Sequence, residues 1–342
     1  MPKLKGVCIG AGYFSQFHFE AWQRLENVDI VGVYDLVKER AESVVVKYGF
    51  NKTYDDVEKM FLKERPDFVD IITPPETHLE LCQLAIKHQI AIICQKPLAP
   101  TLAESTEIAK YVEKSTVRMM VHENFRFQPW HRELKKLLDQ NVIGAQLHTI
   151  HLRMRMGDGW QTDAYMNRQP YFREMERLLI YETGIHFIDV FQYLMGDITQ
   201  VYAKLKTLNP NIKGEDFAWV HFDFANQALG FLDANRYNEN IAEDPRLTFG
   251  SVLIEGEGGS LRLYDNGNIT IQPLGKQERP HKYAFLKQNF SGDCVFHTQS
   301  HFIENLISGN PFETDVTRYL RNIKVLEKVY ESSEKGIPLP VD

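Results

Sequence analysis

Short apolar runs and longer segments with helical spacing alternate along the first third of the chain. The apolar runs have the length and the β-branched content of buried strands, and the segments between them place apolar residues three and four positions apart. The predicted strands cover 7–9, 28–34, 51–54, 67–73, 91–94 and 118–121, and the predicted helices cover 16–25, 37–48, 55–62, 77–87 and 102–114. Strands that alternate with helices predict an α/β domain with a doubly wound parallel sheet over residues 1–121.

The pattern changes after residue 121. A long segment of alternating polarity at 146–156 predicts a strand, and the irregular stretch that follows leads into a helix around 176–195. Further strands are predicted at 200–208, 217–224, 228–236, 248–256, 260–264 and 268–273, and helices at 129–139, 298–308 and 315–334. Residues 122–342 are therefore expected to form an α+β domain on a large, mostly antiparallel open sheet.

A glycine turn joins the first predicted strand to the first predicted helix. Gly10 permits a tight turn, Gly12 lets the backbone approach a pyrophosphate, and the helix N-terminus supplies unpaired N–H groups. This is the fingerprint of a dinucleotide-binding Rossmann domain, although Ser15 stands where a third glycine or alanine is usual. The expected cofactor contacts in this turn are Gly10, Gly12, Tyr13 and Phe14.

Asp35 follows the second predicted strand, where an acidic side chain can accept hydrogen bonds from the adenosine ribose hydroxyls. The same carboxylate would repel the 2′-phosphate of NADP, so NAD is the expected cofactor and NADP the less favoured one. Asp35 can also cap the next helix, which begins near Val37, and the two roles are compatible.

Composition narrows the class of protein. The 342 residues are 43% hydrophobic and 25% charged, with a formal net charge of -7, which argues against nucleic acid or an anionic membrane as the main partner. No segment approaches the roughly 18 apolar residues of a membrane span, and the N-terminus has no secretory pattern. The four cysteines are scattered, which favours a reduced, cytoplasmic protein.

Two strand ends in the first domain carry polar residues. Thr73 and Pro74 end one strand and His78 opens the next helix, while another strand delivers Gln95 and Lys96 to the same edge. Open α/β sheets bind ligands at this edge, so these five residues are expected to contact the cofactor. Pro97 restrains the backbone behind Lys96; the alternative is a solvated lysine beside a turn.

A second polar group lies in the predicted helix of the second domain. Glu182 and His186 are four residues apart and share a helical face, and Asp189 lies one further turn along. A carboxylate beside an imidazole is the arrangement that a general base or acid needs. The alternative is a histidine packed in the core. The histidines show no metal-ligand spacing, so no metal is expected.

These motifs resemble the Gfo/Idh/MocA family, which is named for glucose-fructose oxidoreductase, inositol dehydrogenase and a rhizopine-catabolism protein. The resemblance spans the chain, through the glycine turn, the 73–78 and 96–97 segments, 124–129 and 182–189. It implies NAD(P)-dependent oxidation of a sugar or polyol hydroxyl, with Lys96 and His186 as the acid/base pair. Gln95 and Glu182 depart from the family pattern, which usually has glutamate and aspartate there.

The segment around residues 157–173 resembles a subgroup that includes D-apiose dehydrogenases. Its aromatic rings can stack on the C–H face of a sugar while its polar side chains bond the hydroxyl groups. For Tyr171 and Phe172 an oligomer interface is an equal alternative. The expected substrate contacts are Lys96, Asn124, Arg126, Arg153, Trp160, Tyr165, Arg168, Gln169 and His186.

The expected mechanism places a substrate hydroxyl between Lys96 and His186. His186, oriented by Glu182, takes the proton while hydride passes to NAD, and Lys96 stabilises the alkoxide. Two alternatives stay open: an NAD-binding sensor or regulatory protein without turnover, and an enzyme that recycles tightly bound NAD. Because few helices are available to cover the second sheet, a homodimer or homotetramer through that sheet is also expected.

Overall fold

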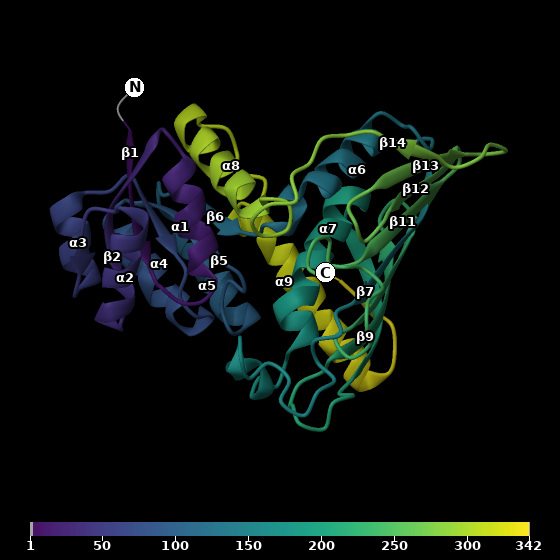
Figure 1. Cartoon of the computed structure of the whole chain (residues 1–342), viewed down its shortest axis with the longest axis horizontal. Helices are drawn as coiled ribbons and strands as arrows, with labels where there is room; N and C mark the ends of the chain where they lie inside the picture. Colours follow the sequence, from purple (N-terminus) through teal and green to yellow (C-terminus); the bar gives the residue numbers. More distant parts are fainter. Residues whose placement is uncertain (1–2, 342) are drawn as a thin grey trace. The chain divides into compact units, whose positions relative to one another are not determined.

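The computed structural model describes residues 3–341, which divide into two compact units (Figure 1). The first unit contains the residues up to Asn124 together with Val295–Arg321. The second contains Phe125–Cys294 and the residues from Asn322 onward. The sequence placed everything beyond residue 121 in one second domain, whereas the structure returns Val295–Arg321 to the first unit.

The first unit is a six-stranded, entirely parallel sheet in the order β3-β2-β1-β4-β5-β6. Its strands are β1 (Leu4–Ile9), β2 (Val28–Tyr34), β3 (Thr53–Tyr54), β4 (Phe68–Ile71), β5 (Ala91–Gln95) and β6 (Met119–His122). The helices between them are α1 (Ser15–Arg24), α2 (Lys38–Tyr48), α3 (Val57–Glu64), the 3₁₀-helix η1 (Pro75–Thr77), α4 (His78–Lys87) and α5 (Leu102–Glu113). The predicted doubly wound sheet is confirmed, and its strand order reverses between β1 and β4, where such sheets bind ligands.

The returning segment packs beside the edge strand β6. Val121 donates its N–H to the carbonyl of Thr314, whose hydroxyl bonds back to the Val121 carbonyl, at 2.9 and 2.6 Å. Arg118 reaches the carbonyl of Asn305 at 2.7 Å. Most of α8 (Cys294–Ser308) and the start of α9 (Val316–Lys335) therefore belong to the first unit. These contacts join residues that are far apart in the sequence, so no local pattern indicates them.

The second unit is built on a nine-stranded sheet in the order β14-β13-β12-β11-β7-β10-β9-β8-β15. Its strands are β7 (Leu147–Arg155), β8 (Ile198–Lys206), β9 (Phe217–Phe224), β10 (Leu229–Asn235), β11 (Ser251–Gly256), β12 (Gly259–Leu263), β13 (Ile269–Pro273), β14 (Arg279–His281) and β15 (Leu339–Pro340). Among the described strands of this nine-stranded sheet only β7 and β10 pair in parallel, so the predicted, mostly antiparallel sheet is confirmed.

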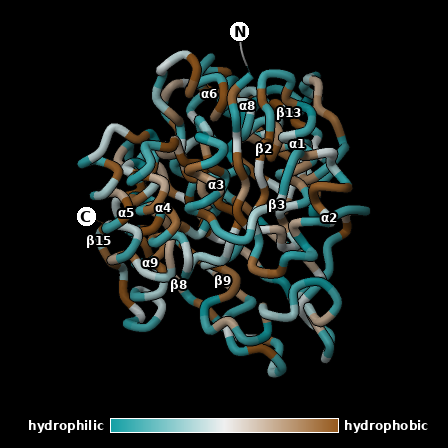
Figure 2. Tube along the Cα trace, turned by 90° about the vertical axis from the view of Figure 1, so that its left-hand side faces the viewer, coloured by the Kyte–Doolittle hydropathy of each residue, from teal (hydrophilic) through white to brown (hydrophobic). Residues whose placement is uncertain are grey.

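One face of this sheet is covered by helices, including α6 (Pro129–Asp139) and α7 (Ile185–Met195) (Figure 1). Phe191 of α7 packs against Phe222 of β9, with ring centroids 5.2 Å apart. Residues of β9 alternate between the two faces, so Val220 and Phe222 are buried while Trp219 is 37% exposed. Figure 2 shows hydrophobic and hydrophilic stretches alternating along the trace.

The expected helix at 176–195 is divided into two types of helix. Residues Leu179–Gly184 form a π-helix, η4, and α7 begins directly after it. The buried Glu215 carboxylate accepts the N–H groups of Leu178 and Ile180, at 3.1 and 2.9 Å. The Glu215 side chain, which is distant in the sequence, therefore stabilises the first turn of the π-helix. Single-turn π-helices are frequent at functional sites.

Candidate active site

The glycine turn has the geometry of a phosphate cradle. Gly10 has a φ of 103°, and a Cβ there would lie 2.9 Å from the carbonyl carbon of Ile72, so only glycine fits. A Cβ on Gly12 would meet nothing within 4 Å, which leaves open space beside the backbone. Ser15, in place of the usual third glycine, turns its hydroxyl back onto the Gly12 carbonyl at 2.7 Å and begins α1. The residues present fit a dinucleotide pyrophosphate.

Asp35 connects this turn to the next helix. Its two carboxylate oxygens accept the N–H groups of Ala11 and Val37, at 2.6 and 2.8 Å. Helix α2 begins at Lys38 with Val37 as its N-cap and has no side-chain cap bond, so the expectation that Asp35 caps this helix is wrong, and the bond that Asp35 accepts from the Val37 N–H precedes the helix. It is compatible with ribose binding, because a carboxylate oxygen has a second lone pair for a further donor.

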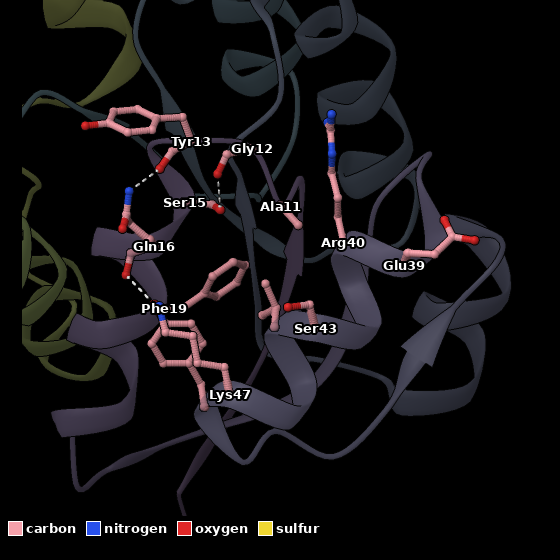
Figure 3. A pocket seen from close by; sticks show the side chains of 12 residues that line it. Ala11, Gly12, Tyr13, Ser15, Gln16, Phe19, Glu39, Arg40, Ser43 and Lys47 are labelled. Atoms are coloured by element: carbon pink, nitrogen blue, oxygen red, sulfur yellow. Dashed lines mark hydrogen bonds between the residues drawn. The ribbon is translucent and has the colours of Figure 1, made fainter. Parts of the chain in front are cut away.

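A pocket of about 550 Å³ lies beside the glycine turn. Figure 3 shows Ala11 and Gly12 on one side and Arg40, Ser43 and Lys47 of α2 on the other. Tyr13, 44% exposed, also lines it. Phe14 lies at the start of α1, with its ring 5.2 Å from that of Phe17. The pocket adjoins the cradle and has the size of a site for a small molecule.

His78 is completely buried and bridges two strand ends. Its ring nitrogens lie 2.9 Å from the carbonyl oxygen of Thr73 and 3.0 Å from that of Leu98. Burial lowers the pKa of His78 by more than these two carbonyls raise it. The hydroxyl oxygen of Thr77 lies 2.7 Å from that of Thr73 and 2.9 Å from the carbonyl oxygen of Pro74. The structure thus gives His78 a role in holding the two loops.

Lys96 lies directly after β5, and its peptide bond to Pro97 is cis. Its backbone N–H donates to the side-chain oxygen of Gln95 at 2.8 Å. The side-chain nitrogen of Gln95 lies 3.1 Å from Nε2 of His18, a residue that the sequence did not single out. The backbone of Lys96 is therefore held by the Gln95 side chain, which in turn contacts His18.

His186 lies in the first turn of α7 and is 6% exposed. Its imidazole stacks on the ring of Phe125, with centroids 4.0 Å apart and planes at 6°. Glu182 lies in the π-helix just before it. A Cβ on Gly184 would lie 2.8 Å from Cδ1 of Ile180, so a larger residue there would require that side chain to shift. The stacked ring has a defined orientation, as an acid/base group requires.

Arg126 forms a fork with a buried carboxylate. Its guanidinium donates to both oxygens of Asp189, at 2.7 and 2.5 Å, and Asn322 adds a third bond at 2.7 Å. Asp189 is completely buried, and it lies one turn beyond His186 on α7. The fork ties the segment that contains Phe125 to the helix that carries His186.

The loop after β7 forms a small core of its own. Tyr165, Phe172 and Leu178 pack together in a cluster completed by Ala164 and Ile212. Burial raises the pKa of the Tyr165 phenol to about 12. Trp160, by contrast, is 48% exposed and donates its indole N–H to Glu239 at 2.8 Å. Gln169 bonds the hydroxyl of Tyr171 at 2.9 Å, within the same loop.

A buried arginine missed by the sequence analysis joins this loop to the π-helix. Arg236 donates to Asp158 at 2.6 Å and to the Thr183 hydroxyl at 3.2 Å. Burial lowers the pKa of Arg236, but the Asp158 carboxylate and the Tyr165 phenol together raise it further, and the net direction is upward. Arg168 also reaches Asp158, at 3.3 Å. Arg236 follows a strand directly, and that position was the only available signal.

The two remaining expected substrate contacts differ in exposure. Arg153 lies on β7 with 61% of its side chain exposed, 3.7 Å from Asp233. Asn124 is 2% exposed, and its side-chain oxygen has no hydrogen-bond partner among residues 3–341. An unsatisfied buried amide oxygen is uncommon and fits a group that binds a ligand.

Within the described part of the chain, no three His, Cys, Asp or Glu side chains gather as a metal site would require. No helix there is long and apolar enough to cross a membrane. The cysteines at 8, 82, 94 and 294 are all buried, and none forms a disulfide.

Comparisons with known proteins concern the family and the fold. Residues 4–123 match the model of an oxidoreductase family with an NAD-binding Rossmann fold, and residues 131–262 match the GFO/IDH/MocA C-terminal domain. D-apiose dehydrogenase from Rhizobium rhizogenes is 30% identical over 98% of this chain and 97% of its own. D-apiose dehydrogenase from Paraburkholderia graminis is also 30% identical, over 98% and 89%.

A solved structure of an oxidoreductase from Agrobacterium radiobacter, in complex with NAD+, L-tartaric acid and magnesium, superposes with a TM-score of 0.91. It is 28% identical, and the match covers 99% of this chain and 98% of the other.

Proposed function

Since the chain belongs to the GFO/IDH/MocA family of NAD-binding oxidoreductases, we propose that it is a dehydrogenase that oxidises a hydroxyl group of a sugar or polyol. D-apiose is the first substrate to test, because two full-length relatives at 30% identity carry that name. The observation that carries the proposal is the imidazole of His186 stacked on Phe125, in a chain whose other unit has an NAD-binding cradle and Lys96 at a strand end.

His186 and Lys96 have different tasks in this proposal. His186 takes the proton from the substrate hydroxyl, and the Phe125 stack holds its ring in place for that transfer. Lys96 contributes a positive charge that stabilises the oxygen as it loses the proton. Glu182 orients His186. NAD, when bound, supplies the hydride acceptor.

The pyrophosphate of NAD binds at Gly12 in this proposal, where the backbone faces open space, and the adenosine ribose binds at Asp35. A 2′-phosphate would bring two more negative charges to that carboxylate, so NAD is preferred to NADP. Kinetic measurement of kcat/KM with both cofactors tests this, and a ratio in favour of NADP would contradict it.

The substrate contacts in this proposal come from two sources. Asn124 brings an unsatisfied amide oxygen, and Trp160 brings an exposed indole ring that can stack on a sugar. Arg153, Arg168, Gln169 and Tyr165 were expected from the sequence as well. We propose that Arg168 and Gln169 support the loop, since they bond Asp158 and Tyr171. Arg126 acts through Asp189, as a residue that positions α7.

The experiment is a screen of aldoses, polyols and lactone precursors, with D-apiose included, in which absorbance reports NAD reduction. Lys96→Met and His186→Ala serve as matched variants, and each is expected to lower kcat by two or more orders of magnitude while NAD affinity stays near wild type. A His186→Ala protein with normal turnover would assign the histidine to packing. Wild-type protein that binds NAD but oxidises no compound would instead favour a sensor or regulatory protein.

We also propose that the chain forms a homo-oligomer through the uncovered face of the nine-stranded sheet. Trp219 lies between Tyr202 and Phe231 on that face, with ring centroids 6.3 and 6.4 Å away, and Leu229 is 37% exposed. Exposed aromatic residues are enriched in interfaces. Light scattering of the wild type and of Trp219→Lys tests this, because the variant is expected to dissociate, and a monomeric wild type at micromolar concentration would contradict it.

A cytoplasmic location is proposed from the cysteines, which are buried and unbridged. The net charge of -7 supports a small-molecule substrate over nucleic acid as the partner. Fractionation of the native host cells tests the location, and recovery of the protein outside the cytoplasm would contradict it.

A further inference from the structure

Buried polar side chains of the first unit form a hydrogen-bonded chain of contacts that ends at the backbone of Lys96. It joins His18 of α1, Asp70 of β4 and Gln95 of β5. Nδ1 of His18 lies 2.8 Å from Oδ2 of Asp70, and Nε2 lies 3.1 Å from the amide nitrogen of Gln95. His18 and Asp70 are completely buried, and Gln95 is 9% exposed. Polar groups at such depth are costly unless each finds a suitable partner.

Two obligate donors at the ends of this chain assign its hydrogen bonds. At one end the backbone N–H of Lys96 can only donate, so the Gln95 atom it contacts at 2.8 Å is the oxygen. At the other end the indole N–H of Trp22 can only donate, and it lies 2.7 Å from Oδ2 of Asp70. That carboxylate oxygen is therefore an acceptor.

The protonation state of His18 follows from the two donors, the Lys96 N–H and the Trp22 indole N–H. Because the oxygen of Gln95 faces Lys96, its NH₂ group faces His18 and must donate to Nε2. Nε2 then carries a lone pair, and the ring hydrogen is on Nδ1, where it donates to Asp70. His18 is a neutral imidazole of one defined tautomer in this arrangement.

We propose that Gln95 is a positioning residue for Lys96, and that His18 and Asp70 hold the Gln95 amide in the orientation that accepts the Lys96 N–H. This inference rests on the proposed role of Lys96 in the reaction. If the amide group flipped, so that its oxygen and nitrogen exchanged places, its NH₂ group would face the N–H of Lys96. Two donors would then face each other, and the hydrogen bond to the Lys96 backbone would be lost.

The same geometry accounts for the departure from the glutamate that the family usually has at this position. A glutamate at 95 would accept from Lys96 with one oxygen and would need a hydrogen on Nε2 of His18 for the other. It therefore suits an imidazolium, whereas Gln95 suits a neutral ring. The two arrangements carry the same net charge of about -1 among the three side chains, but glutamate places a negative charge beside Lys96, which a positive charge on His18 balances.

Other groups around His18 do not alter this assignment. The ring of His122 stacks on it at 4.1 Å, and that of Phe14 meets it edge-on at 5.7 Å. Cys8 lies near Asp70, and both burial and the Asp70 charge raise the pKa of its thiol, which keeps it neutral. Gln299 donates to the backbone carbonyl of His18 at 3.4 Å and makes no bond to Lys96.

The first test reads the tautomer directly, without an activity assay. Protein labelled with ¹⁵N-histidine is examined by long-range ¹H–¹⁵N correlation at neutral pH, with His18→Gln to assign the signal. The wild type is expected to show a neutral His18 with its hydrogen on Nδ1, and Gln95→Glu an imidazolium. A hydrogen on Nε2 in the wild type, or the same neutral ring in both proteins, would overturn the assignment.

The second test separates positioning from general stability. Gln95→Leu is expected to lower kcat about 10- to 100-fold with NAD affinity unchanged, since a displacement of about 1 Å can cost that much. Gln95→Glu should retain most of the activity, but lose it when combined with His18→Leu. Gln299→Leu is the matched control, because it removes a buried amide on the same histidine, and it should keep its kcat.

Normal turnover of folded Gln95→Leu, or an equal loss in Gln299→Leu, would overturn the positioning role. If the wild type oxidises no sugar or polyol, the proposed function fails, and the tautomer measurement alone still decides the hydrogen-bond assignment.

Discussion

Replacement of Asp189 by asparagine should destabilise the second unit far more than the same change at a comparable arginine-aspartate fork. Asp189 accepts three bonds, two from Arg126 and one from Asn322, and none of its surface is exposed. Asparagine keeps the shape of the side chain. It removes the negative charge and turns one acceptor into a donor that faces Arg126 or Asn322.

The expected magnitude follows from the burial of the pair. Removal of one partner from a buried ion pair costs about 3–5 kcal/mol, because the remaining charge is left uncompensated. The Arg126 side chain is 14% exposed and gains some relief from water, so the lower end, about 3 kcal/mol, is expected. For a unit of this size that corresponds to a fall in melting temperature of about 6–12 °C.

Asp233→Asn is the matched control. Asp233 also pairs with an arginine, since both of its carboxylate oxygens accept from Nη2 of Arg155, at 2.8 and 2.7 Å, but its side chain is 23% exposed. Because water screens that pair, its loss should cost about 1 kcal/mol or less. Scanning calorimetry and urea titration of the two variants give the comparison. Equal shifts in the two proteins would refute the argument that burial sets the cost.

Three further predictions concern the cofactor cradle, the base and the loops. Gly12→Val should keep the melting temperature within about 1 °C yet weaken NAD binding at least tenfold, measured by NADH fluorescence, because its side chain would fill the open space of the cradle; unchanged affinity would place the pyrophosphate elsewhere. Glu182→Gln should lower kcat by less than His186→Ala, since it acts only through the imidazole, and steady-state kinetics that show equal losses would contradict this order. Burial lowers the pKa of His78 below its ordinary value of 6.5, so the neutral ring stabilises the fold above about pH 6.5 and that contribution falls as the pH drops; the stability difference between wild type and His78→Asn should narrow in urea titrations from pH 7 to pH 5, and parallel curves would refute it.

Local signals in the sequence were sufficient for the two sheets and most of the helices, but not for the return of Val295–Arg321 to the first unit. Strands of apolar residues, helices of period 3.6 and the Gly10–Gly12 turn each depend on neighbours in the chain, and the structure reproduces them with shifts of a few residues at most ends. The same holds for the place of Lys96 directly after a buried strand. Features that depend only on neighbouring residues can therefore be predicted from the sequence.

The contacts that hold the candidate catalytic groups were decided only by tertiary structure. The π-helix before His186 depends on Glu215, more than thirty residues away, and the Arg126 fork depends on Asp189 and Asn322. Hydrogen bonds between distant segments leave no periodic trace, because a single buried acceptor looks like any other polar residue in the chain. Gln95 shows the difference most clearly: the sequence marks it as a departure from a family pattern, and only the positions of His18 and Asp70 in the fold give that departure a chemical reason.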